Sequence, residues 1–143
     1  MLKWTAGRAR PYNDVEKPHD FSFGRGTRAD DYRSFPSGHS TAGFAAAAAV
    51  VSETSRWWPK STWYIGPAMY GGAALIGLSR MYNNKHWGSD VWMGAAIGTF
   101  AGRKIVEYHH SHPNNRIDKW LLSGSITRGE SGSYHLRLGI LPQ

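Results

Sequence analysis

Three short groups of residues carry side chains suited to holding a phosphate-sized anion, and they follow one another along the chain. The first group is Lys3, followed after six residues by Arg10 and Pro11. Lysine supplies a compact positive charge, and arginine a planar fork that can bond two oxygens of one anion. Taken alone, two basic residues in a polar segment are better explained as ordinary surface side chains. The first group therefore indicates an anion site only in combination with the other two groups.

The second group is Pro36-Ser37-Gly38-His39, immediately before an alanine-rich stretch. Free amides at the start of a helix attract anions, and glycine lets the backbone come close to them. The same residues also suit a helix N-cap at Ser37 and a solvated first-turn histidine at His39. His39 acquires a chemical role only where an anion binds beside it.

The third group is Ser79-Arg80, then His86, then Asp90. His86 and Asp90 are four residues apart, so one helical turn would bring the carboxylate to the imidazole. The carboxylate could then fix the tautomer and leave the other ring nitrogen free to attack. Arg80 adds a third cation. The alternative interpretation is a helix-capping Asp90 with a loop histidine and a surface arginine.

Helices must position these groups, and three apolar stretches of the sequence predict such helices. Residues 40–52 carry no charge and include the run Ala45–Ala49, which favours a helix ending near Pro59. Residues 61–79 are uncharged and rich in small residues, which indicates close helix packing. Residues 91–108 form the third predicted helix. The fold class is therefore all-α, a helical bundle.

The length of the second stretch raises the question of a membrane. At about 1.5 Å per residue it reaches roughly 28 Å, close to the hydrocarbon thickness of a bilayer. Trp57, Trp58 and Trp63 lie where an interfacial aromatic belt would place them. A membrane-embedded bundle is therefore one expectation, and a soluble bundle with small-residue packing fits these lengths equally well.

The two ends of the chain differ from the helices. Residues 1–35 are polar and basic, contain prolines and glycines, and predict a long catalytic loop. In the tail, Tyr134, Leu136, Leu138 and Ile140 alternate as in a strand, and Gly129 and Gly132 could turn a short β-hairpin. We expect a catalytic core over 1–112 and a tail over 113–143.

Composition narrows the class of partner. The chain has 143 residues, enough for one domain, and its 41% hydrophobic content is too high for a disordered segment. A net charge of +7 favours phosphates, nucleic acid or acidic lipid. The arginines of the N-terminal loop share it with acidic residues, so we expect no nucleic-acid partner. The absence of cysteine excludes disulfides, thiol nucleophiles and cysteine zinc sites.

Together, Lys-x6-Arg-Pro, Pro-Ser-Gly-His and Ser-Arg-x5-His-x3-Asp resemble the signature of the type 2 phosphatidic acid phosphatase superfamily. That superfamily also contains bacterial acid phosphatases and vanadium haloperoxidases. The resemblance implies a hydrolase acting on a lipid phosphate or lipid pyrophosphate without a metal or other cofactor. It also implies a bacterial inner membrane location with the active site on the extracytoplasmic side. It leaves the oligomeric state open.

The resemblance also implies a role for each motif residue. Phosphate oxygens would be held by Lys3, Arg10, Ser37, Gly38 and Arg80. His86 would be the nucleophile that forms a phosphohistidine, and Asp90 would orient it. His39 would protonate the departing alkoxide and then activate water.

One departure from the superfamily affects these expectations. In its six-helix membrane members the first motif follows the third helix, whereas here it begins at Lys3. The chain is therefore expected to be a C-terminal half that lacks three helices. Three other functions stay open, namely a soluble-type acid phosphatase, a haloperoxidase and an inactive fragment that only binds anions.

Overall fold

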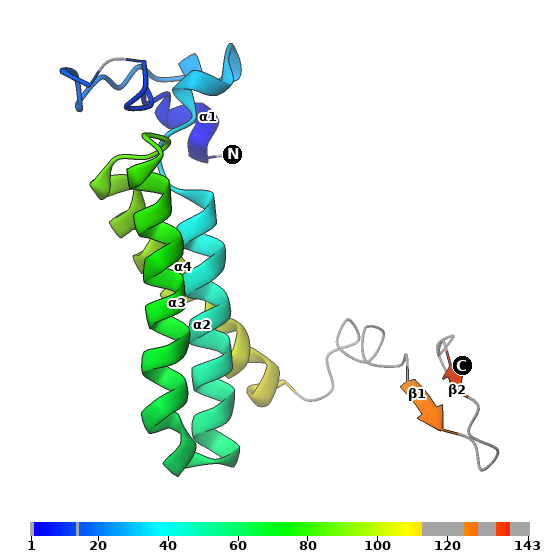
Figure 1. Cartoon of the computed structure of the whole chain (residues 1–143). Coiled ribbons are helices and arrows are strands. Elements are labelled where there is room, and N and C mark those ends of the chain that lie inside the picture. The colour runs from blue at the N-terminus through cyan, green and yellow to red at the C-terminus, as the bar shows by residue number, and fades with distance from the viewer. Residues whose placement is uncertain (1, 14, 113–124, 129–133, 138–143) are drawn as a thin grey trace. The chain divides into compact units, whose positions relative to one another are not determined.

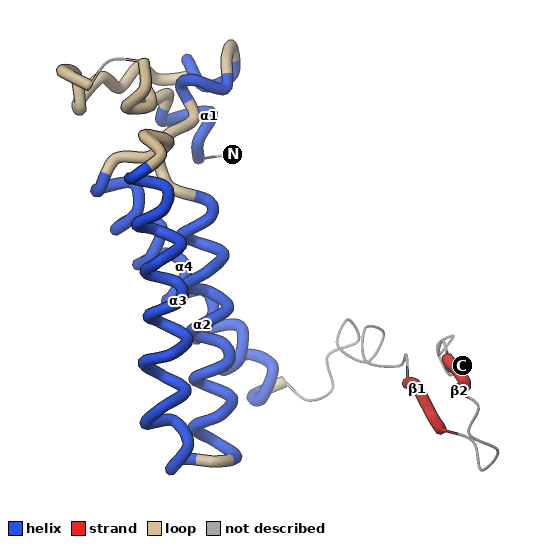
Figure 2. Tube along the Cα trace, in the orientation of Figure 1, coloured by secondary structure: helices blue, strands red, loops and turns tan. Residues whose placement is uncertain are grey.

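The computed structural model describes residues 2–13, 15–112, 125–128 and 134–137 (Figures 1 and 2). Its helices and strands are α1 (Leu2–Ala6), α2 (Gly38–Trp57), α3 (Thr62–Tyr82), α4 (Gly88–Ser111), β1 (Ser125–Arg128) and β2 (Tyr134–Arg137). Short 3-10 helices span Arg25–Thr27, Asp30–Tyr32 and Pro59–Ser61. The all-α class is confirmed for the part of the chain that carries the three motifs.

The three predicted long helices are present, with boundaries displaced by no more than one turn. Helix α2 begins after Ser37, whose Oγ accepts a hydrogen bond from the Ser40 amide at 3.4 Å. It ends at Trp57, just before Pro59. Helix α3 is followed by Asn84 in the left-handed region, at a φ of 52°, which turns the chain toward α4.

Helices α2 and α4 approach each other closely through glycines on α4. A Cβ atom on Gly94 would lie 2.6 Å from the Ser37 carbonyl oxygen, and one on Gly98 would lie 2.2 Å from that of Thr41. No side chain fits between backbones at these distances. Close helix packing, which was predicted for residues 61–79, is thus also found on α4.

On α3 the small residues behave differently from the prediction. Ala73 and Gly77 are buried, and Gly77 faces Val91 of α4. At Gly66 and Gly71, by contrast, an added Cβ would meet no atom within 4 Å. Residue size alone could not predict this, because the sequence does not specify which side of the helix is covered.

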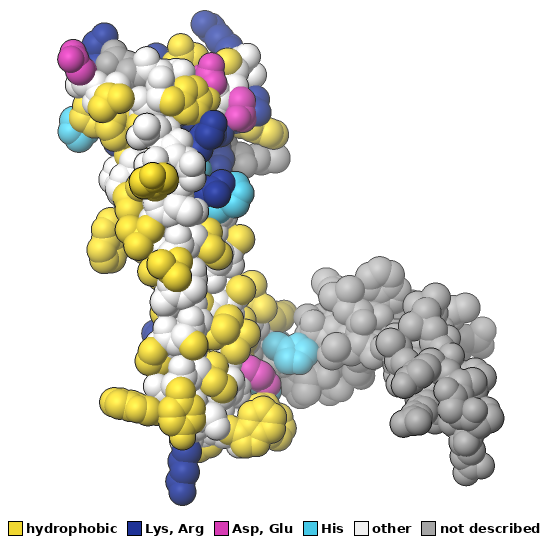
Figure 3. Space-filling model, viewed as in Figure 1, with side chains coloured by type: hydrophobic (Ala, Val, Ile, Leu, Met, Phe, Trp, Pro, Cys, Tyr) yellow, Lys and Arg dark blue, Asp and Glu magenta, His cyan; other side chains and the backbone are white. Residues whose placement is uncertain are grey.

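The outward faces of the helices carry many large apolar side chains. Tyr82 is 90% exposed and Trp92 is 79% exposed. Figure 3 shows such side chains along the helical part of the visible face. Yet no helix among the described residues is both long and apolar enough to cross a bilayer. The prediction of membrane-embedded helices is therefore not confirmed.

The N-terminal segment lies at one end of α2, α3 and α4 (Figure 1). It was predicted to be a loop throughout, but Lys3 lies in the short helix α1. Gly7, at a φ of 56°, ends that helix in the left-handed conformation that glycine tolerates. The rest of the segment folds back on itself, with a β-bridge between Arg8 and Phe21.

The chain divides into two compact units, residues 1–106 and 107–143. In the second unit β1 and β2 pair antiparallel, with Ser125 opposite Arg137 and Arg128 opposite Tyr134. The predicted hairpin is therefore confirmed. The expected turn glycines, Gly129 and Gly132, and the alternating positions Leu138 and Ile140 lie outside the described residues.

Candidate active site

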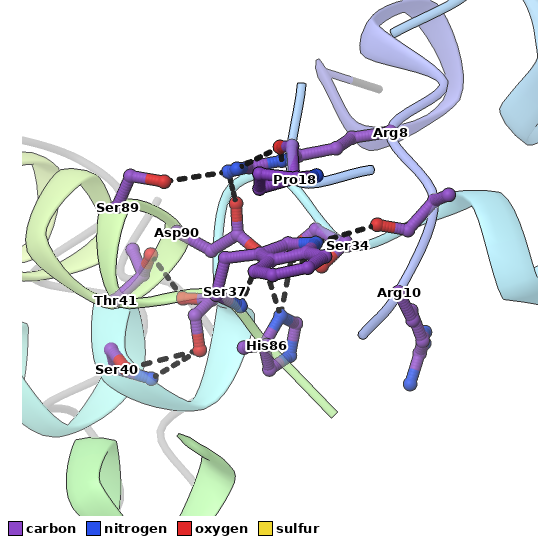
Figure 4. Close-up of polar contacts among 12 residues, drawn as sticks. Arg8, Arg10, Pro18, Ser34, Ser37, Ser40, Thr41, His86, Ser89 and Asp90 are labelled. Atoms are coloured by element: carbon purple, nitrogen blue, oxygen red, sulfur yellow. Dashed lines mark hydrogen bonds and ion pairs between the residues drawn. The ribbon is translucent and has the colours of Figure 1, made fainter. Parts of the chain in front are cut away.

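Asp90 is fully buried at the third position of α4 and is the centre of a polar network (Figure 4). Its Oδ2 accepts a hydrogen bond from the Trp87 amide at 2.9 Å and another from the Ser34 hydroxyl. Its Oδ1 forms an ion pair with Arg8. A carboxylate that reaches back to the amide preceding a helix is one half of a capping box, so Asp90 caps α4.

The surroundings of Asp90 keep it ionised. Burial by itself raises the pKa of a carboxyl group. Contacts with His86, with the Ser34 hydroxyl and with the Trp87 amide, followed by the charge of Arg8, outweigh that effect and hold the pKa of Asp90 below its ordinary value. Asp90 is therefore a buried negative charge at neutral pH.

His86 lies in the connection between α3 and α4 and is only 4% exposed. Its Nδ1 lies 2.8 Å from the carbonyl oxygen of Ser34 and 3.7 Å from Oδ2 of Asp90. A carbonyl oxygen can only accept, so Nδ1 carries the proton in this hydrogen bond. In the neutral ring, Nε2 then holds the free electron pair. The Ser34 carbonyl is thus nearer to the imidazole than the predicted orienting group, Asp90.

Ser37 joins the start of α2 to the start of α4. Its amide donates to the main-chain carbonyl of Asp90 at 2.9 Å, and its Oγ accepts from the Ser40 hydroxyl at 3.0 Å. The side chain is fully buried. Ser37 therefore acts as a helix cap, the alternative that the sequence left open, and its contact with a phosphate stays a prediction.

Lys3 and Gly38, from two different motifs, meet at the start of α2. A Cβ atom on Gly38 would lie 3.2 Å from Nζ of Lys3, so the lysine occupies the space that a side chain would fill. Burial, and then the charge of Arg10, lower the pKa of Lys3, whereas Asp30 and Asp90 oppose that shift. The geometry places a cation directly over the amino end of a long helix.

His39 is exposed in the first turn of α2 and lies within electrostatic range of the other predicted residues. Burial lowers that pKa first, and the charges of Arg80, His86, Lys3 and Arg10 lower it further. These groups come from α1, the N-terminal segment, the end of α3 and the loop before α4. The fold therefore brings all three motifs into one electrostatic environment.

The two arginines of the predicted phosphate site are held differently. Arg10 donates from Nη2 to Oδ2 of Asp30 at 2.9 Å and from Nε to the Asp30 carbonyl at 3.2 Å. Arg80, at the end of α3, donates from Nε to the hydroxyl of Ser79 at 3.3 Å. Arg10 is thus already bonded to a carboxylate, an acceptor of the same charge sign as a phosphate.

Three residues of this network were missed in the sequence analysis, namely Arg8, Ser34 and Trp87. Arg8 lies inside the first motif, and its charge was the one available signal. Ser34 and Trp87 act partly through a main-chain carbonyl and a main-chain amide, which any residue could supply, and partly through the Ser34 hydroxyl and the Trp87 indole. Within the described residues, no group of three or more histidine, cysteine, aspartate or glutamate side chains is arranged to hold a metal ion.

Comparisons with known proteins agree with the motifs. A lipid A 1-phosphatase of Porphyromonas gingivalis is 43% identical to this chain over 57% of it, which corresponds to 18% of that relative. An undecaprenyl-diphosphatase of Sulfolobus acidocaldarius is 26% identical over 85% of this chain and 53% of its own length. The chain thus spans about half the length of one relative and less of the other.

No solved structure matches the chain closely enough to serve as a comparison. The PAP2 superfamily, by contrast, matches residues 1–113, a range that contains all three motifs and the helices α1 to α4 that carry them. The superfamily predicted from Lys3, Arg10, Ser37, His39, His86 and their neighbours is confirmed. The chain belongs to the PAP2 superfamily.

Proposed function

We propose that this chain hydrolyses a lipid phosphate or lipid pyrophosphate through a phosphohistidine on His86. The observation that carries the proposal is the hydrogen bond from Nδ1 of His86 to the Ser34 carbonyl, which leaves Nε2 as the nucleophilic nitrogen. The cations grouped around His39 support the same proposal. So do the two relatives, whose names state lipid-linked substrates.

The phosphoryl group binds between the start of α2 and the three cations. Lys3 lies over Gly38, and Arg10 and Arg80 act on the same region, as the lowered pKa of His39 indicates. The amino end of α2 adds the partial positive charge of its free amides. Phosphoryl transfer depends mainly on positioning and on neutralising charge, and this arrangement supplies both.

In the first chemical step, Nε2 of His86 forms a bond to phosphorus. The bond between phosphorus and the leaving oxygen breaks, and its electron pair goes to that oxygen. His39 gives its proton to the oxygen, which leaves as an alcohol or as a phosphate. The buried carboxylate of Asp90 lies 3.7 Å from the ring and stabilises the positive charge that develops on it.

His39 must be protonated for this step, and binding of the substrate favours its protonated form. In the free chain the neighbouring cations lower its pKa. A bound phosphate dianion neutralises them, so the pKa rises in the complex. In the second step the now neutral His39 removes a proton from water, whose oxygen attacks phosphorus. The bond from phosphorus to Nε2 breaks, and inorganic phosphate leaves.

The lipid character of the substrate is supported by the apolar surface. Trp92 and Phe100 on α4 and Trp63 on α3 are large and largely exposed. Such side chains suit contact with acyl or polyprenyl chains at a lipid surface. The proposed location is the bacterial inner membrane with the site on the extracytoplasmic side. Basic residues at the opposite end, Arg56 and Lys60, favour a cytoplasmic position for that end.

The test is to trap the intermediate. Substrate labelled at phosphorus should give an acid-labile, base-stable phosphoenzyme with the wild-type chain, and none with His86→Ala. The matched control is His19→Ala, because His19 is an exposed histidine of the N-terminal segment outside the motifs. Binding of inorganic phosphate without turnover of any ester would instead indicate an anion-binding module. Faster hydrolysis of soluble esters than of lipid phosphates would indicate a soluble-type acid phosphatase.

A further inference from the structure

Among the charged residues that the structure describes in the N-terminal segment, Arg8 is the most deeply enclosed, with 3% of its surface exposed. Two aromatic rings lie against its guanidinium. Its Cζ is 4.9 Å from the ring centroid of Phe21 and 5.5 Å from that of Trp87. An arginine is buried at high cost unless its charge is paired and its donors are used.

Every nitrogen of the Arg8 guanidinium has a partner. Nη1 donates to Oδ1 of Asp90 and, at 2.7 Å, to the hydroxyl of Ser89. Nε and Nη2 both donate to the carbonyl of Pro18, with Nε at 3.1 Å. A planar fork makes this set of bonds, and the single ammonium of a lysine cannot reproduce it. Four of the five N–H donors of Arg8 are thus used within the protein.

The contact joins two segments that carry different parts of the site. Arg8 lies between Lys3 and Arg10, and it meets Asp90 across 82 residues of sequence. A second bond between the same segments runs from Nε1 of Trp87 to the carbonyl of Ala9, at 2.9 Å. The start of α4 is thus joined to the cation-bearing segment at two successive residues, Arg8 and Ala9.

We propose that Arg8 is a positioning residue, which clamps the Asp90 carboxylate and so sets where Lys3 and Arg10 stand relative to the imidazole of His86. The inference rests on the proposed function and deepens it. Arg8 acts through Asp90 and through its own chain neighbours, without touching the phosphoryl group.

The test uses the full chain and four variants. These are Arg8→Gln, Arg8→Lys, Asp90→Asn and the double variant Arg8→Gln/Asp90→Asn. The matched control is Arg25→Gln, because Arg25 forms an ion pair with Asp20 at 2.8 Å and lies 4.1 Å from the ring centroid of Tyr32. It therefore removes a comparable arginine from the same segment, but one that does not reach Asp90.

We expect Arg8→Gln to lower kcat for an aryl phosphate by about 100-fold, the usual effect of a small displacement of reacting groups. The acid limb of its pH profile should move up by about one unit, because the charge of Arg8 helps to hold the pKa of Asp90 down and its loss raises that pKa. Lys3 and His86 also act on Asp90, and both remain in this variant. Arg8→Lys should recover part of the rate, and Arg25→Gln should leave the acid limb in place.

The double variant shows whether Arg8 acts through Asp90. If it does, Arg8→Gln/Asp90→Asn is no slower than Asp90→Asn alone, and it unfolds at a higher temperature than Arg8→Gln, which leaves a buried charge without its partner. Additive losses of rate would overturn the inference, as would an Arg8→Gln chain with wild-type kcat and an unmoved acid limb. A wild-type chain that hydrolyses no phosphate ester would instead contradict the proposed function.

Discussion

The active-site end of the molecule and the body of its helices differ in the kind of residue that each buries. At the site, the largest fully buried side chains are polar, namely Asp90, Ser34, Ser37 and Ser40. In the body of the helices, the buried residues are small, such as Ala47, Ala48 and Gly98, while large apolar side chains face outward (Figure 3). Most proteins bury the apolar groups and expose the polar ones.

Different interactions therefore hold the proposed catalytic residues in place and pack the helices together. The polar network fixes the imidazole of His86 through specific hydrogen bonds, each of which depends on one partner. The contact between α2 and α4 depends instead on the absence of side chains at Gly94 and Gly98. Changes at the site should therefore affect rate more than stability, and changes at the glycines should do the reverse.

The largest effect should follow from His39→Ala, which removes the proposed proton donor and leaves the network around Asp90 intact. General acid catalysis contributes about 10² to 10⁴-fold, or roughly 3 to 5 kcal/mol. We expect a loss of that size with a lipid phosphate and a much smaller loss with an aryl phosphate, whose leaving group needs little protonation. The measurement is kcat/KM for both substrates.

His86→Ala provides the comparison for this variant, because loss of the nucleophile should slow both substrates equally. Both chains should keep the wild-type circular dichroism spectrum. An equal dependence on the leaving group in the two variants would contradict the division of roles between the histidines.

The next effect concerns stability and compares two glycines. In Gly98→Ala the new methyl group would overlap the Thr41 carbonyl, so α2 and α4 must separate, at a cost of about 1 to 3 kcal/mol. In Gly71→Ala the methyl group meets nothing, and the better helix former should stabilise the chain by about 0.5 to 1 kcal/mol. Thermal unfolding measures both changes, and a shift of the same sign in the two variants would contradict the close α2–α4 contact.

These two regions also differ in how far they could be predicted. The three helices follow from uncharged stretches and from Pro59, because those signals are local. Which face of each helix is covered does not follow from the sequence, because it depends on the elements that pack against that helix. Glycines at 94, 98 and 102 recur every four residues, and this spacing was the available signal for the α4 contact.

At the site, the side chains of the three motifs could be predicted, whereas the Arg8 side chain and the main-chain contacts could not. The motif residues Lys3, Gly38, His39 and Arg80 do share one environment. The bond that holds His86 comes from the carbonyl of Ser34, and no sequence pattern distinguishes one carbonyl from another. Their catalytic roles remain predictions.

A smaller effect should be visible in the pH dependence of the wild-type chain. In the free chain, burial and the nearby cations lower the pKa of His39 below the ordinary histidine value, and a bound phosphate dianion should raise it again. Since His39 must be protonated to act, kcat/KM should decline with rising pH at a lower pH than kcat does, by about one unit. Profiles of His39→Ala give the baseline for ionisation of the substrate itself, and coincident alkaline limbs in the wild type would contradict this account.

The smallest expected effect concerns Asp30, whose carboxylate pairs with Arg10. Asp30 pairs with Arg10 at 2.9 Å and with Arg33 at 3.4 Å, both in an exposed setting where ion pairs contribute about 0 to 1 kcal/mol. Asp30→Asn should free Arg10 and remove a negative charge near the bound phosphate. We expect inorganic phosphate to inhibit about two- to fivefold more tightly at low salt, with the gain fading as salt screens the charge. Asp20→Asn, which breaks the pair with Arg25, is the matched control, and weaker inhibition in Asp30→Asn would show instead that Asp30 holds Arg10 in its binding position.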